Sequence, residues 1–209
     1  MNEQLIDNLV DQVVAKINEE RGFLVEASGR HVHLSQEHID ALFGKGYQLT
    51  IDKYLSQPGQ YAAKERVTIL GPKGALHNVV ILGPARSASQ VEISATDALP
   101  LGVKAPVRES GDIEGTPGIV LMNGSKTVTL EKGLIVAKRH VHVSAADAIK
   151  MNVAQGDIVK VRINSEQRSL IFDDVVIRVS DKFVTAMHID YDEANACSFK
   201  KGTRGYIVK

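Results

Sequence analysis

The chain has 209 residues, with 25 basic and 25 acidic side chains and one cysteine, Cys197. This length suffices for one large or two small domains, and the balanced charge gives no indication of binding to nucleic acid or to a membrane surface. A single cysteine excludes a disulfide framework and a cysteine-based zinc cluster, and no apolar run approaches the ~20 residues of a membrane span, so we expect a soluble cytoplasmic protein.

Residues 1–20 have the pattern of an amphipathic helix, because apolar side chains recur at helical spacing between charged ones. These apolar residues are Leu5, Ile6, Leu9, Val10, Val13, Val14 and Ile17. The segment lacks the basic start and unbroken apolar stretch of a secretory signal. Two interpretations stay open: a helix packed on its own domain, or a detachable helix whose apolar stripe binds a partner.

The following segment begins with a strand expected at 23–27, which leads into Arg30-His31-Val32-His33. Ser35 is the expected N-cap of a short helix that ends at Gly44. Residues 44–64 are expected to form an irregular, partly helical insertion. Strand patterns then flank two turn sequences, Gly71-Pro72-Lys73-Gly74 and Asn123-Gly124, and each predicts a hairpin.

After a second run, Arg139-His140-Val141-His142, the same order of elements is repeated. Ser144 is again an expected N-cap, with Asp147 at the capping-box position. The expected strands of this half span residues 157–163, 169–179, 183–189 and 205–208. Many short strands with few short helices favour β-barrels or sandwiches over a doubly wound parallel sheet.

The two His-Val-His runs are candidate metal sites. Side chains two residues apart on a strand share one face, so each run presents two imidazoles together, and imidazole is a preferred zinc ligand. A single run is equally typical of a hydrogen-bonded histidine pair on a sheet. Its repetition 109 residues later favours metal binding.

A second repeat supplies a third ligand for each pair. Val79-Val80-Ile81 matches Val175-Val176-Ile177 at a shift of 96 residues, and the same shift sets Glu92 opposite His188. The two predicted half-sites are His31, His33 and Glu92, and His140, His142 and His188. Three ligands with one open position are typical of catalytic zinc. The remaining histidines, His38 and His77, are expected to be structural or surface residues.

Arg86 is the candidate anion-binding residue. It lies in a loop of small residues six positions before Glu92, and a guanidinium group matches the oxygens of phosphate. The alternative is an arginine paired with an acidic neighbour. Arg30 and Arg139 point away from the adjacent histidines if their strands are regular, so they are expected to form internal salt bridges.

Several ordered motifs between residues 24 and 209 together resemble the phosphate propanoyltransferase family of propanediol utilisation. They are Ser28-Gly29-Arg30-His31-Val32-His33-Leu34-Ser35, Gln57-Pro58-Gly59-Gln60-Tyr61-Ala62-Ala63, Leu82-Gly83-Pro84-Ala85-Arg86-Ser87, Gln90-Val91-Glu92-Ile93-Ser94, Gly115-Thr116-Pro117-Gly118, Arg139-His140-Val141-His142, Met187-His188-Ile189-Asp190 and Glu193-Ala194-Asn195-Ala196.

The resemblance implies a mainly β fold with two small antiparallel barrels and short helices. One barrel would comprise residues 20–29 and 138–209, and the other residues 30–137. It further implies two zinc ions held by the six predicted ligands, with Arg86 contacting phosphate. The implied reaction interconverts short-chain acyl-CoA and phosphate with acyl phosphate and coenzyme A, and the resemblance implies propanoyl-CoA as the preferred substrate with acetyl-CoA as an alternative.

The family also implies a setting. Its N-terminal helix often directs the enzyme into a bacterial microcompartment, which fits residues 1–20 as an encapsulation segment that binds a shell protein. A homo-oligomer is expected. The preferred acyl chain and the residues that bind the nucleotide of coenzyme A are not indicated by the sequence.

Two other functions use the same residues. A dinuclear zinc hydrolase would activate water and cleave acyl-CoA or acyl phosphate without needing phosphate. A non-catalytic metal-binding module associated with a shell would turn over neither compound. Spacing and periodicity alone indicate a metalloenzyme with two sites, and the transferase follows from the resemblance.

Overall fold

The structure is a computed structural model that describes residues 6, 9–10, 13 and 22–208. Most of the predicted helix at 1–20 therefore lies outside the described residues. Within it, Ile6, Leu9, Val10 and Val13 are helical and exposed. No helix among the described residues is both long and apolar enough to cross a membrane.

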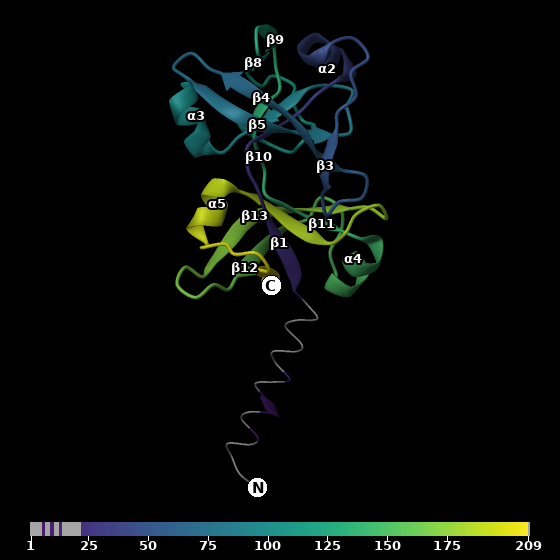
Figure 1. The fold of residues 1–209 in the computed structure, drawn as a ribbon. Helices are drawn as coiled ribbons and strands as arrows, with labels where there is room; N and C mark the ends of the chain where they lie inside the picture. Colours follow the sequence, from purple (N-terminus) through teal and green to yellow (C-terminus); the bar gives the residue numbers. More distant parts are fainter. Residues whose placement is uncertain (1–5, 7–8, 11–12, 14–21, 209) are drawn as a thin grey trace.

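Six strands form a closed barrel, the lower unit in Figure 1. They are β1 (Phe23–Ser28), β11 (His140–Val143), β12 (Ile158–Ile163), β13 (Leu170–Val179), β14 (Ala186–Asp190) and β15 (Arg204–Val208). Their order around the barrel is β1-β14-β11-β13-β12-β15. Helices α4 (Ala145–Met151) and α5 (Tyr191–Ala196) follow β11 and β14 in the chain.

The upper unit in Figure 1 is a nine-stranded sheet, which forms a half-barrel. Its strands are β2 (His31–His33), β3 (Ile51–Tyr54), β4 (Tyr61–Leu70), β5 (Ala75–Gly83), β6 (Gln90–Glu92), β7 (Val107–Arg108), β8 (Ile119–Asn123), β9 (Lys126–Leu130) and β10 (Leu134–Ala137). The order is β7-β10-β6-β2-β5-β4-β8-β9, with β3 beside β4. Helices α2 (Gln36–Phe43) and α3 (Ala95–Leu101) belong to this unit.

The mainly β class predicted from the sequence is confirmed, and both units mix parallel and antiparallel pairs. Strand β2 runs parallel to β5 and antiparallel to β6. Strand β11 runs parallel to β13 and antiparallel to β14 in the same way. The two hairpin predictions are also confirmed, at β4–β5 and at β8–β9, where Gly124 takes a positive φ of 58°.

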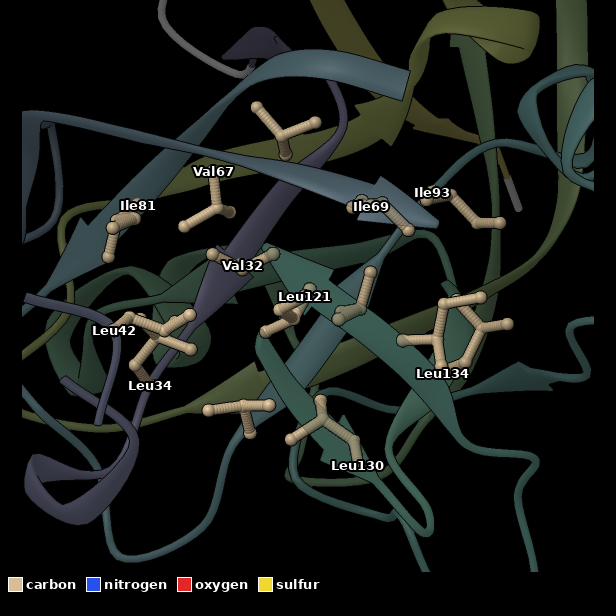
Figure 2. Packing of buried hydrophobic residues seen from close by; sticks show 14 of the residues in the cluster. Val32, Leu34, Leu42, Val67, Ile69, Ile81, Ile93, Leu121, Leu130 and Leu134 are labelled. Carbon is tan, nitrogen blue, oxygen red and sulfur yellow. The ribbon is translucent and has the colours of Figure 1, made fainter. Parts of the chain in front are cut away.

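Each unit has its own apolar core. In the upper unit, Val32, Ile69 and Leu121 are fully buried and converge from β2, β4 and β8 (Figure 2). In the barrel, Val141 and Ile177 are likewise fully buried. Since burying one such side chain contributes about 1.5–3 kcal/mol, each core fixes which face of its strands points inward.

At two places, strands that are consecutive in the sequence belong to different units. Strand β1 pairs with β14 in the barrel, although β2, which follows it directly, belongs to the upper sheet. Strand β10 pairs with β6 in the upper sheet, although β11 belongs to the barrel. The chain therefore crosses between units immediately before each His-Val-His run, so both runs lie at the junction.

Residues 44–64 differ from the sequence prediction, because the structure has strands and no helix there. Strand β4 already begins at Tyr61 and pairs with β3, in which Tyr54 lies opposite Tyr61. Tyrosine, isoleucine and threonine favour extended backbone, and pairing with a long neighbouring strand stabilises it. The turn between these strands reaches the barrel, where the buried Gln57 amide donates to the Val184 carbonyl at 2.9 Å.

Candidate active site

Side chains alternate between the two faces of β2 and β6, and this alternation directs the first set of predicted ligands toward the junction. Val32 and Val91 face each other across the strand pair and are buried in the core of the upper unit. Successive side chains on a strand point to opposite faces, so His31, His33 and Glu92 point away from that core. His31 lies directly opposite Glu92 in the register.

These three side chains are buried and form one cluster whose ligand atoms all lie within 4.8 Å of one another. His31 Nε2 is 3.3 Å from Glu92 Oε2, and His33 Nε2 is 3.7 Å from Glu92 Oε1. His31 Nδ1 donates to the Gly29 carbonyl at 2.8 Å, which leaves its Nε2 with a free lone pair when the ring is neutral. This is the arrangement of a metal-ligating histidine whose ring is oriented by a backbone acceptor.

The barrel repeats this arrangement with three imidazoles. His140 lies opposite His188 in the register, and the His140 Nδ1 donates to the Lys138 carbonyl at 2.9 Å, as His31 does to Gly29. The ring centroids of His140, His142 and His188 are 4.7 to 5.2 Å apart. The structure thus brings together the members of both predicted half-sites.

Two nitrogens of the second cluster, His142 Nδ1 and His188 Nε2, are buried without a hydrogen-bond partner among the described residues. Buried polar atoms are normally satisfied, so such an exception requires an explanation. His188 Nδ1 faces the Glu26 carboxylate at 3.7 Å, a carboxylate–histidine pair of the kind that supports metal ligands. The donor set of both clusters therefore fits zinc.

The charge states also fit metal binding. Burial lowers the pKa of His33 to about 3, and that of His140 and His188 to about 4, so these rings are neutral at pH 7. Neutral imidazole is the ligating form. Burial also lowers the pKa of His31, but the adjacent Glu92 carboxylate more than offsets this and raises it above its usual value.

Hydrogen bonds fix the orientation of the Glu92 carboxylate. Gln90 Nε2 and Ser110 Oγ both donate to Glu92 Oε1, at 2.6 and 2.8 Å, which leaves Oε2 toward His31. Burial alone would raise the pKa of Glu92, but the neighbouring histidines and Ser110 hold it well below the usual range. The carboxylate is therefore ionised, as a ligand must be.

Arg86 lies beside the first cluster. Its backbone N–H donates to the Leu34 carbonyl at 2.9 Å, just beyond His33, and its guanidinium donates to Ser110 Oγ at 3.2 Å. No carboxylate among the described residues forms an ion pair with it. Arg86 is therefore a cation at the site with hydrogen-bonding capacity to spare.

Arg30 and Arg139 form the internal salt bridges expected of them. Arg30 pairs with Asp97 at 2.8 Å, and Arg139 pairs with Glu193 at 2.8 Å. Each acid is the third residue of its helix and also closes a capping box, so each arginine connects a His-Val-His strand to a helix N-terminus. Of the other histidines, His77 forms a hydrogen bond with Thr68 at the surface, and His38 forms one with the hydroxyl of the buried Ser89. Both contacts are of the structural or surface kind expected from the sequence.

The two clusters open into one pocket at the junction, with about 370 Å³ of space that is partly open to solvent. His31 and Glu92 line it from the upper unit, and His140 and His188 line it from the barrel. The Glu92 charge acts on both His140 and His188, which places the clusters close to each other. A ligand in this pocket would contact both sets.

Four residues near the clusters were missed by the sequence analysis: Glu26, Gln90, Ser110 and Arg178. Gln90 had a local signal, since residues two apart on a strand share a face. Ser110 lies on a loop 18 residues from Glu92, and Arg178 lies within an ordinary strand, so only the register reveals them.

Comparison with known proteins identifies the family of the chain. Residues 24–200 match the family model described as phosphate propanoyltransferase. The chain is 62% identical to a phosphate propanoyltransferase of Listeria monocytogenes, over 100% of this chain and 98% of that protein. It is 61% identical to one of Enterococcus faecalis, over 98% and 97%, and 54% identical to one of Thermotoga maritima, over 96% and 95%.

Proposed function

Because the chain belongs to the phosphate propanoyltransferase family, we propose that it transfers a short acyl group between coenzyme A and phosphate. Propanoyl-CoA and phosphate would give propanoyl phosphate and coenzyme A, and acetyl-CoA would be a second substrate. The observation that carries the proposal is a single pocket lined by both His-containing clusters, with the Arg86 guanidinium beside one of them and in no ion pair among the described residues.

We further propose that two zinc ions occupy the clusters, one held by His31, His33 and Glu92, the other by His140, His142 and His188. The neutral imidazoles, the oriented carboxylate and the unpartnered nitrogens of His142 and His188 support this assignment. Zinc, when bound, is a Lewis acid that polarises a carbonyl and stabilises a thiolate.

Arg86 would hold the phosphate. Its guanidinium offers two parallel donors to the oxygens of a phosphate and keeps the anion at the edge of the pocket, oriented toward a thioester carbonyl. Ser110, which already accepts from Arg86 and donates to Glu92, sets the position of the arginine relative to the cluster.

The acyl group would pass directly from coenzyme A to phosphate, without an acyl-enzyme. Cys197 is fully buried within the barrel core. Ser89 contacts His38 at 2.7 Å, but the hydroxyl is buried and accepts from the Ser35 backbone, so it anchors α2. Neither residue is therefore placed as a nucleophile. Ping-pong kinetics with a trapped acyl-enzyme would contradict direct transfer.

The test combines metal analysis with turnover of acetyl-, propanoyl- and butanoyl-CoA in the presence and absence of phosphate. We expect bound zinc, thioester loss that requires phosphate, and formation of acyl phosphate. Protein stripped by a chelator and then reloaded with zinc is the control for metal dependence. Coenzyme A released without phosphate would indicate a hydrolase, and active protein without a transition metal would refute the two-zinc assignment.

The location and assembly state are also proposals. We propose a cytoplasmic homo-oligomer that is packaged in a bacterial microcompartment, with residues 1–20 binding a shell protein. The exposure of Ile6, Leu9, Val10 and Val13 supports this role, because these apolar side chains are not covered by the barrel.

A further inference from the structure

Arg178 faces the active-site junction. In the parallel pair of β11 and β13, Ile177 lies opposite Val141, and both are fully buried in the barrel core. Arg178 lies opposite His142 in the same register. Because neighbours in a strand alternate between faces, Arg178 and His142 share the face that points away from the core, toward the second cluster.

The charge of Arg178 reaches both units. After burial and the neighbouring imidazoles, it is a further cause of the lowered pKa of His140 and His142, and it also acts on His188. Burial lowers the pKa of Arg86, and the Glu92 carboxylate opposes this effect. The charge of Arg178 lowers the pKa of Arg86 further. The two guanidinium groups therefore approach the same region from opposite units.

Neither of these arginines has a carboxylate within ion-pair distance in the part of the chain that the structure describes. Among the described residues, the side chain of Arg178 forms no hydrogen bond and no ion pair, and that of Arg86 donates only to the Ser110 hydroxyl. Arg30 and Arg139, by contrast, are both paired with acids. Two half-buried like charges that act on each other are unfavourable unless an anion binds near both.

We propose that Arg178 is a second anion-binding residue, which together with Arg86 holds the phosphoryl group of phosphate or acyl phosphate between the two units. The inference rests on the proposed function and deepens it. A phosphoryl group carries up to two negative charges and several acceptor oxygens, so it can accept from two planar guanidinium groups on different sides. Arg178 would contribute to binding the anion and would leave the metal ligands unchanged.

The repeat does not generate this pair. At the shift of 96 residues, Lys182 is the counterpart of Arg86 and Leu82 is the counterpart of Arg178. Each unit thus adds one arginine at a position of its own. The anion would be bound with full affinity only where the two units meet.

The test uses Arg178→Gln, which keeps hydrogen bonding without charge, and Arg178→Lys, which keeps charge without the planar fork. Arg162→Gln is the matched control, because Arg162 is exposed on the neighbouring β12 and its side chain hydrogen bonds only to Asn164 among the described residues. For Arg178→Gln we expect the KM for phosphate to rise about tenfold or more, with partial recovery in Arg178→Lys. The KM for propanoyl-CoA, the zinc content and the melting temperature should stay unchanged.

Calorimetric titration with inorganic phosphate provides a readout independent of turnover. Arg178→Gln should weaken phosphate binding to the zinc-loaded protein by a similar factor, and Arg162→Gln should not. If the KM for propanoyl-CoA rose while that for phosphate stayed constant, Arg178 would bind a phosphate of coenzyme A, and the inference would be wrong. Loss of zinc in Arg178→Gln would also overturn it, since the arginine would then support His142.

The two proposals can fail separately. If the unsubstituted protein bound phosphate but formed no acyl phosphate, the proposed function would fail, and the titration would still decide the role of Arg178. If the unsubstituted protein formed propanoyl phosphate and Arg178→Gln bound phosphate equally well, only the inference about Arg178 would fail.

Discussion

Glu92 and His188 occupy equivalent positions in the two units. Glu92 lies opposite His31 where β6 runs antiparallel to β2, and His188 lies opposite His140 where β14 runs antiparallel to β11. One cluster therefore contains a carboxylate, and the other contains imidazoles alone. This difference explains why the pKa of His31 is raised whereas burial lowers that of His140.

Replacing Glu92 with Gln should lower the pKa of His31 in metal-free protein. The carboxylate is what opposes burial at this ring, so its removal should move the pKa from above to below the usual value of 6.5. Histidine NMR titration in the presence of a chelator would measure this change, with the exposed His77 as internal reference. An unchanged His31 pKa would show that the pair at 3.3 Å is not formed in solution.

His31→Ala and His140→Ala should each remove about one zinc per chain and reduce turnover, because each removes a ligand from a different cluster. Metal analysis after dialysis against a weak chelator would show the loss. His77→Ala is the matched control, since His77 is exposed and its side chain hydrogen bonds only to the Thr68 hydroxyl among the described residues. Loss of both ions from either single variant would mean that the clusters bind metal as one unit.

Arg86→Ala should retain zinc but weaken the use of phosphate by about 2–4 kcal/mol in transition-state stabilisation, with partial recovery in Arg86→Lys. The relevant measurements are zinc content and kcat/KM for phosphate. Ser110→Ala is an informative comparison, because it removes the hydroxyl between Arg86 and Glu92 while leaving the guanidinium in place. If Arg86→Ala lost zinc as readily as His31→Ala, the arginine would be a structural support of Glu92.

Metal-free protein should become less stable as the pH falls from 6.5 to 4.5. His140 and His188 have a pKa of about 4 in the folded state and 6.5 when unperturbed, so over this interval the unfolded chain takes up protons that the folded chain excludes. The loss should amount to about 1 to 3 kcal/mol for each ring at the lower pH. Urea unfolding with a chelator at both pH values would measure it.

The variant His140→Asn is the control for this pH effect. In His140→Asn the pH dependence should be weaker, because one of the excluded protons is gone. His31 contributes in the opposite sense only above pH 6.5, where its raised pKa lets the folded state lose stability as pH rises. Stability that stayed constant between pH 6.5 and 4.5 would contradict the burial of these rings.

Deleting residues 1–20 should leave kcat and KM nearly unchanged while reducing self-association or co-purification with shell proteins. The described side chains of this segment are exposed, and the deletion ends before β1 begins at Phe23. Steady-state kinetics and size-exclusion chromatography would test this. Loss of soluble folded protein would favour a helix that packs on its own domain.

The repeat made the grouping of the clustered side chains predictable. A shift of 96 residues aligns Glu92 with His188, and the registers place both opposite the first histidine of a run. Period-two alternation then indicated which side chains share a face. These predictions succeeded because sheet geometry converts spacing along the chain directly into direction in space.

Other features needed the fold. Arg178 is a charged residue next to an apolar run in β13, and nothing local distinguishes a solvent-exposed arginine from one that faces a cluster. The strand pairing of 51–54 was also missed, since an edge strand depends on the neighbour it joins and has weak local signals. Both the direction of Arg178 and the pairing of 51–54 depend on the register between strands that are far apart in the sequence. No local pattern in the sequence specifies that register.

The crossing of the chain between units sets an order for its synthesis. All strands of the upper sheet lie between residues 31 and 137, so that sheet can form before the rest of the chain is made. Strand β1 leaves the ribosome earlier still, yet its partners begin only at Ala186 and Arg204. The nascent chain therefore carries an unpaired strand edge through most of translation, and the barrel, with its imidazole cluster, can close only when the last strand has emerged.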